Sequence, residues 1–166
     1  MVRRNSAFDI ALGGILAALA VVILSMGTLI PVATFVCPML CMLLLKVVLT
    51  RCGSRIGWAW YGAVAVLGAL LAPDKEAAAV FVFLGFYPII KPKLDALPAK
   101  WLWKLLYFNA AILVMYWLLM HLLGMAQIAE EFAELGVVMT IVTLLLGNVT
   151  FLLLDRLLGM RQRKKR

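Results

Sequence analysis

The residues with the clearest chemical potential form one short turn, Pro73-Asp74-Lys75-Glu76, whose charges alternate in sign between two apolar segments. A turn of this kind is either a solvated connection with local ion pairs or a place where a polar solute is oriented between helix ends. We predict ligand-binding side chains in this turn and at the matching depth of neighbouring segments. The predicted set is Thr34, Asp74, Lys75, Glu76, Tyr116 and His121.

The sequence lacks the residue patterns of an enzyme or a metal site. His121 is the single histidine, and a lone histidine supports neither a zinc site nor a nucleophilic triad. Cys37 and Cys41 lie four residues apart on one helix face, which favours buried structural thiols, as we also expect for Cys52. No Walker loop, HExxH, GxSxG or pair of catalytic carboxylates is present. We therefore predict no enzymatic activity, no metal and no cofactor.

A stripe of small residues runs along the first apolar segment. Small side chains at this spacing share one helix face and let a second helix approach closely. Two interpretations stay open, namely packing within the chain's own bundle and a docking surface for another membrane subunit. The stripe consists of Ala7, Ala11, Gly14 and Ala18.

The composition shows which elements must position these residues. Of 166 residues, 66% are hydrophobic and 14% are charged, whereas a soluble domain is about half apolar and a quarter charged. A soluble globular protein is thereby excluded. Because a helix needs about 20 apolar residues to cross the bilayer, six crossings leave no room for a separate soluble domain. We predict an all-α polytopic membrane protein with six transmembrane helices in a single domain, 1–166.

The limits of the helices follow from breaks in the apolar pattern. The 36 uncharged residues from Ile10 to Leu45 would make a helix about 54 Å long, so the chain must turn back near Pro31. The helix with Gly85 and Pro88 is expected to be kinked, tilted or incompletely spanning. We expect a basic loop at 91–100, a lid or loop at 126–132 and a basic cytoplasmic tail at 159–166. The predicted helices are 7–29, 33–49, 56–72, 75–90, 101–123 and 136–158.

The distribution of positive charge predicts the orientation in the membrane. With these helices, fifteen of the sixteen Lys and Arg residues fall on one side, and Lys75 falls on the other. Lys and Arg are retained on the cytoplasmic side of membrane proteins, so both termini are predicted to be cytoplasmic. The net charge of +8 then reports topology and contact with the lipid bilayer, and we expect no nucleic-acid partner.

Polar residues within the predicted spans are few. Asn109 and Asn148 are placed to hydrogen-bond between the last two helices. No Asp or Glu occurs in the middle of the membrane, which weighs against an autonomous carrier driven by protons or sodium.

The pattern resembles the S components, or substrate-binding subunits, of energy-coupling factor transporters. The residues that carry the resemblance are Ala-Leu-Gly-Gly-Ile-Leu-Ala-Ala-Leu at 11–19, where that family is expected to have an AxxxA-like motif. Here Gly14 and Ala18 form a relaxed GxxxA, and Ala7 and Ala11 form a strict AxxxA. The runs at 71–78 and 85–93 are also similar to those of small membrane proteins of Gram-positive bacteria.

The resemblance implies a role and a set of partners. It implies a multi-pass protein of the bacterial cytoplasmic membrane that captures a small nutrient such as a vitamin. Its partners would be a transmembrane coupling subunit, docked on the small-residue stripe, and two ABC ATPases. The alternative is a non-transporting scaffold or assembly subunit of a cell-envelope complex, which would use the same stripe and bind no solute.

Overall fold

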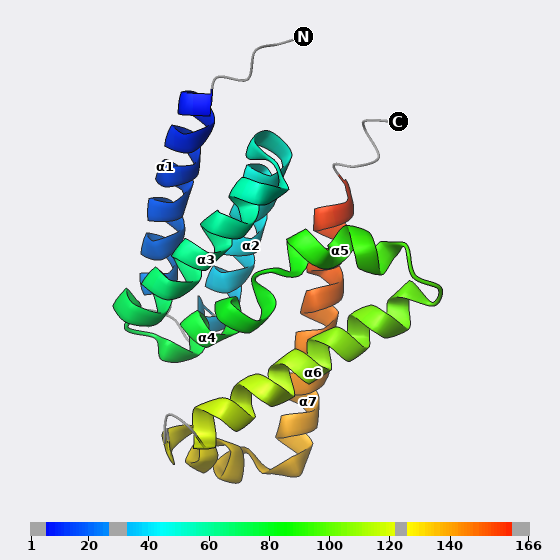
Figure 1. Cartoon of the computed structure of the whole chain (residues 1–166). Coiled ribbons are helices and arrows are strands. Elements are labelled where there is room, and N and C mark those ends of the chain that lie inside the picture. The colour runs from blue at the N-terminus through cyan, green and yellow to red at the C-terminus, as the bar shows by residue number, and fades with distance from the viewer. Residues whose placement is uncertain (1–5, 27–32, 122–125, 161–166) are drawn as a thin grey trace. The chain divides into compact units, whose positions relative to one another are not determined.

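The structure is a computed structural model that describes residues 6–26, 33–121 and 126–160. The side chains of residues 126–140 lie outside the described part. Every regular element within the described ranges is an α-helix (Figure 1). The helices are α1 (Ser6–Ser25), α2 (Ala33–Cys52), α3 (Ser54–Leu71), α4 (Lys75–Leu84), α5 (Tyr87–Asp95), α6 (Lys100–His121) and α7 (Ala126–Met160).

Five stretches of the described chain are long and apolar enough to cross a membrane. They are Ala7–Ser25, Thr34–Cys52, Ser54–Leu71, Lys75–Asp95 and Lys100–Leu119. The all-α fold is thus confirmed, and the five stretches suggest a multi-pass membrane protein. The predicted sixth crossing at 136–158 lies within α7, part of whose side chains are not described, and it remains a prediction, as does the orientation of the termini.

Several predicted boundaries are corrected. The predicted helix 75–90 is two helices, α4 and α5, separated at Gly85 and Phe86, and α5 continues through the first half of the predicted loop 91–100. The segment 126–132 belongs to α7 and is not a loop. Only Gly53 separates α2 from α3, because its φ of 91° lets the chain reverse within one residue. The predicted loop between these two helices was therefore too long.

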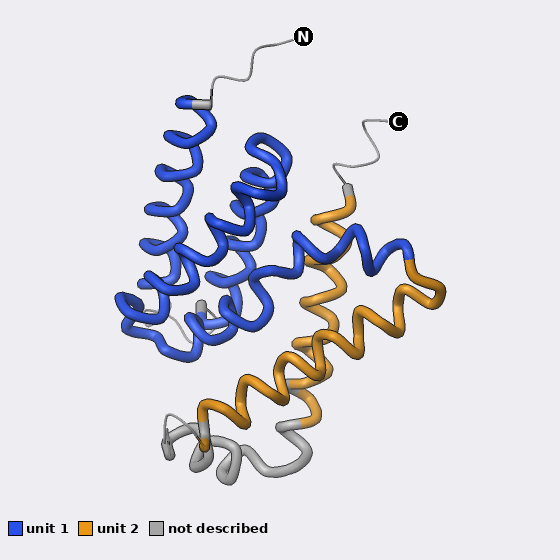
Figure 2. The backbone as a smooth tube through the Cα atoms, in the orientation of Figure 1, with its two compact units in different colours: residues 1–96 blue, residues 97–166 orange. Residues whose placement is uncertain are grey.

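The packing divides the chain into two compact units, residues 1–96 and 97–166 (Figure 2). The first unit contains α1 to α5 and the second contains α6 and α7. In the first unit α1, α2 and α3 run alternately in opposite directions (Figure 1). The single domain predicted from composition stays a prediction.

The core of the first unit lies between α1, α2, α3 and α4. Its buried side chains include Leu24, Leu45, Val64 and Phe81. All three cysteines are buried free thiols, which confirms that part of the prediction.

Hydrogen bonds to backbone carbonyls attach α1 to α2 and α3. The Trp60 indole Nε1 donates to Gly13 O at 3.1 Å. The thiols of Cys41 and Cys52 donate to Ala20 O and Asp9 O, each at 3.4 Å. Trp60 is therefore a core residue.

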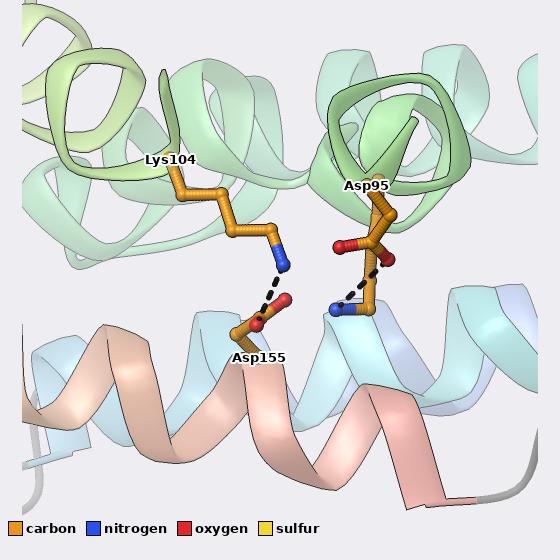
Figure 3. Close-up of polar contacts among 4 residues, drawn as sticks. Asp95, Lys104 and Asp155 are labelled. Carbon is orange, nitrogen blue, oxygen red and sulfur yellow. Dashed lines mark hydrogen bonds and ion pairs between the residues drawn. The ribbon is translucent and has the colours of Figure 1, made fainter. Parts of the chain in front are cut away.

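In the second unit, the contacts between α6 and α7 follow one antiparallel register. The rings of Phe108 and Phe151 stack with centroids 4.8 Å apart. Next to them the amides of Asn109 and Asn148 donate to each other's oxygens at 3.1 and 3.2 Å, as the sequence predicted. Nearer the end of the hairpin, Lys104 Nζ lies 2.8 Å from Asp155 Oδ2 (Figure 3).

Candidate functional site

The structure brings together two members of the predicted ligand set, Thr34 and Asp74. The Thr34 hydroxyl donates to Asp74 Oδ2 at 2.9 Å, and the Ala77 amide donates to Asp74 Oδ1 at 2.9 Å. Asp74 is thus the N-cap of α4, a position where a carboxylate satisfies an amide that has no partner within the helix. Both carboxylate oxygens therefore have a donor from the protein itself, and they join the start of α2 to the start of α4.

Lys75 and Glu76 also stabilise helix ends. Lys75 Nζ donates to Ala69 O at 3.0 Å and lies 3.5 Å from Leu70 O. These are carbonyls of the last turn of α3, where a cation is favoured by the helix dipole. Glu76 lies in the first turn of α4, where a negative charge is favoured for the same reason. The four residues 73–76 act chemically as a capping element between α3 and α4.

Tyr116 and His121 belong to α6 in the second unit. The His121 ring is exposed, stacks on Trp117 with centroids 5.1 Å apart, and has Nδ1 3.0 Å from Trp117 O. Tyr116 is half-buried on the same helix. A single ligand site that combines these two residues with Thr34 and Asp74 stays a prediction.

The small-residue stripe lies on the outer face of α1. All four of its residues are exposed in the chain. A Cβ atom added to Gly14 would meet no other heavy atom within 4 Å. The opposite side of the helix, with Gly13, Ala20 and Leu24, is buried. Of the two interpretations left open, packing of the stripe inside the described bundle is therefore not observed.

Two ion pairs are among the polar contacts that were not predicted from the sequence. Lys104 is 5% exposed and pairs with Asp155, and Lys91 is equally buried and lies 3.5 Å from Asp95. Figure 3 draws the two pairs, each of which lies within one unit. The spacing of four residues in Lys91 and Asp95 was a usable signal for an ion pair along a helix, but the other pair required the register of α6 against α7.

Tyr61 makes another contact that was not predicted from the sequence. Its hydroxyl donates to the carbonyl of Val82, across from α3 to α4. The spacing of residues in the sequence gives no indication that Tyr61 lies next to the Val82 carbonyl.

Among the described residues, no three His, Cys, Asp or Glu side chains come close enough to hold a metal ion. The comparisons with known proteins gave no match for the chain, whether with protein families, with curated proteins or with solved structures. The helices and their exposed and paired residues are therefore the basis on which a function can be proposed.

Proposed function

We propose that the chain is the substrate-capture membrane subunit of an ATP-driven importer of the energy-coupling factor type. The observation that carries the proposal is the exposed face of Ala7, Ala11, Gly14 and Ala18 on α1. Small residues on a lipid-facing helix give up side-chain contact with lipid and allow the backbone of another helix to approach. The face is next to large exposed side chains, among them Phe8 and Ile15, which can pack around such a helix.

No Asp or Glu occurs in the middle of the described spans. This favours a subunit that obtains its energy from partner proteins over a carrier driven by protons or sodium. The sequence contains no Walker loop, and in this proposal the coupling subunit and two ATPases would supply the energy of ATP hydrolysis. The solute would be a small nutrient that enters between α2 and α4, where Thr34 and Asp74 meet, with Lys75 and Glu76 beside them. Tyr116 and His121 complete the proposed ligand set, and both termini are proposed to be cytoplasmic.

Co-purification tests the docking face. Gly14→Leu combined with Ala18→Leu fills the face with two large side chains, and we expect loss of a coupling subunit and two ATPases that the unchanged chain retains. The matched control is Ala59→Leu with Ala63→Leu, because these residues are also exposed and four apart, on α3. Retention of the partners by the α1 variant would show that the face does not dock them.

A scaffold subunit without a ligand is the second candidate. The observation that favours it is the complete internal use of Asp74, whose two oxygens accept from Thr34 and Ala77. Mass spectrometry of small molecules retained through gentle purification separates the candidates. A stoichiometric nutrient supports capture, whereas lipid alone in several detergents supports the scaffold.

A further inference from the structure

The fourth candidate span, Lys75–Asp95, is interrupted near its middle. The α-helical pattern of α4 ends with Gly85 N donating to Phe81 O at 2.7 Å. The next turn is tighter, with Ile89 N donating to Phe86 O at 2.9 Å. Pro88 has no N–H group, so a continuous helix would leave the Leu84 carbonyl without its usual donor. The interruption thus has a local cause in the sequence.

Tyr61 bonds to the backbone at this interruption. Its hydroxyl, on α3, donates to Val82 O on α4. In an uninterrupted helix that oxygen accepts from the amide four residues later, which belongs to Phe86. In the hydrocarbon region no water is available to donate a hydrogen bond to a carbonyl. A side-chain donor at the Val82 carbonyl therefore stabilises the bent form.

The ring of Tyr61 contacts both sides of the interruption. Its centroid lies 5.8 Å from that of Phe81 on α4 and 5.8 Å from that of Phe86, which precedes α5. Phe86 also stacks on Trp58 of α3 at 6.4 Å. A change in the angle between α4 and α5 would therefore change the contacts of the Tyr61 ring with Phe81 and Phe86.

Gly85 determines where the chain bends. A Cβ atom at this position would lie 2.2 Å from the Phe81 carbonyl oxygen and 2.9 Å from the Phe81 ring. Because the closest atom belongs to the backbone, no side-chain rotation relieves the contact. The observed angle between the two helices depends on the absence of a side chain here.

We propose that the interruption at Gly85 and Phe86 is a hinge and that Tyr61 is its latch. The hydroxyl of Tyr61 holds the bent form, and its release lets α5 reorient relative to α4. The hinge does not depend on the proposed transport role.

Hydrogen–deuterium exchange of the full chain in lipid nanodiscs tests the latch. In Tyr61→Phe we expect the amides of 83–92 to exchange about tenfold faster, the factor that corresponds to loss of one hydrogen bond. Exchange in α1 should not change. The control Tyr107→Phe removes a phenolic hydroxyl from α6 and should leave 83–92 unchanged. Unchanged exchange in Tyr61→Phe, or equal acceleration throughout residues 6–96, would refute the latch.

A distance measurement tests the movement itself. Leu70 on α3 and Lys93 on α5 are exposed, so Leu70→Cys and Lys93→Cys accept spin labels while the native thiols are buried. We expect one distance for the labelled chain and a second, separate distance after Tyr61→Phe is added. A single unchanged distance in both would show that α4 and α5 form a rigid bend.

Discussion

At the level of single residues, the described polar side chains are mostly engaged with the backbone or with one another. Thr34 bonds to Asp74, Trp60 bonds to Gly13, and Tyr61 bonds to Val82. The physical reason is the absence of water from the hydrocarbon region, where an unsatisfied polar group costs several kcal/mol. To bind here, a polar solute must therefore replace some of these internal hydrogen bonds with hydrogen bonds of its own.

The contact between Thr34 and Asp74 predicts how substitutions of these residues change the free energy of unfolding. Thr34→Val removes one donor to the carboxylate and should lower the free energy of unfolding by about 1 kcal/mol. Asp74→Ala removes both that bond and the cap of α4, and should lower it by about 2 kcal/mol. Thermal unfolding in one detergent measures both. If Thr34→Val proved as damaging as Asp74→Ala, the cap would contribute nothing.

At the level of elements, polar pairs determine the register of helices that are otherwise apolar. Along α6 and α7, the contacts Lys104 with Asp155, Phe108 with Phe151 and Asn109 with Asn148 all belong to one antiparallel alignment. Apolar side chains alone tolerate a shift of one turn, because lipid and neighbouring helix offer similar contacts. A shifted hairpin would separate these polar partners.

The buried ion pair of this hairpin predicts an asymmetric response to mutation. Lys104→Met removes the ammonium group from beside the largely buried Asp155 carboxylate and should destabilise the chain by about 3 kcal/mol. Lys104→Met with Asp155→Leu removes both charges and should recover most of that loss. Unfolding of the single and double variants in the same lipid mixture measures the difference. A double variant as unstable as the single one would mean that the pair itself supplies the stability.

At the level of the whole molecule, the five long apolar stretches account for the excess of hydrophobic residues on the surface. Side chains such as Leu70, Leu102 and Leu113 are more than 60% exposed. Exposed apolar surface of this extent requires lipid or a protein partner to cover it. The small-residue face of α1 is the part of this surface that we assign to a partner.

The predicted orientation in the membrane can be tested with two introduced cysteines. With both termini cytoplasmic, Lys75→Cys should react with a membrane-impermeant maleimide added to intact cells, and Arg166→Cys should react only after permeabilisation. The native thiols are buried and give little background. Reaction of both introduced cysteines from the same side would refute the arrangement of charges on which the topology is based.

The fold class and several local features could be predicted without the structure. The high apolar content predicted long apolar helices, five of which are long and apolar enough to cross a membrane, and the turn at 73–76 predicted the start of a helix that the structure places at Lys75. The buried cysteines and the bond between Asn109 and Asn148 were also predicted. These features depend on local backbone chemistry or on the polarity of a residue within an apolar segment, which can be read without knowing which helices are neighbours.

Which side chains meet depends on how the helices pack, and this could not be predicted from the sequence. The bonds from Trp60 to Gly13 and from Tyr61 to Val82, and the pair of Lys104 with Asp155, join residues 21 to 51 positions apart. In helices that are apolar all round, periodicity does not identify the inward face, because every face is compatible with lipid. The contacts between helices therefore select the partners of Trp60, Tyr61 and Lys104.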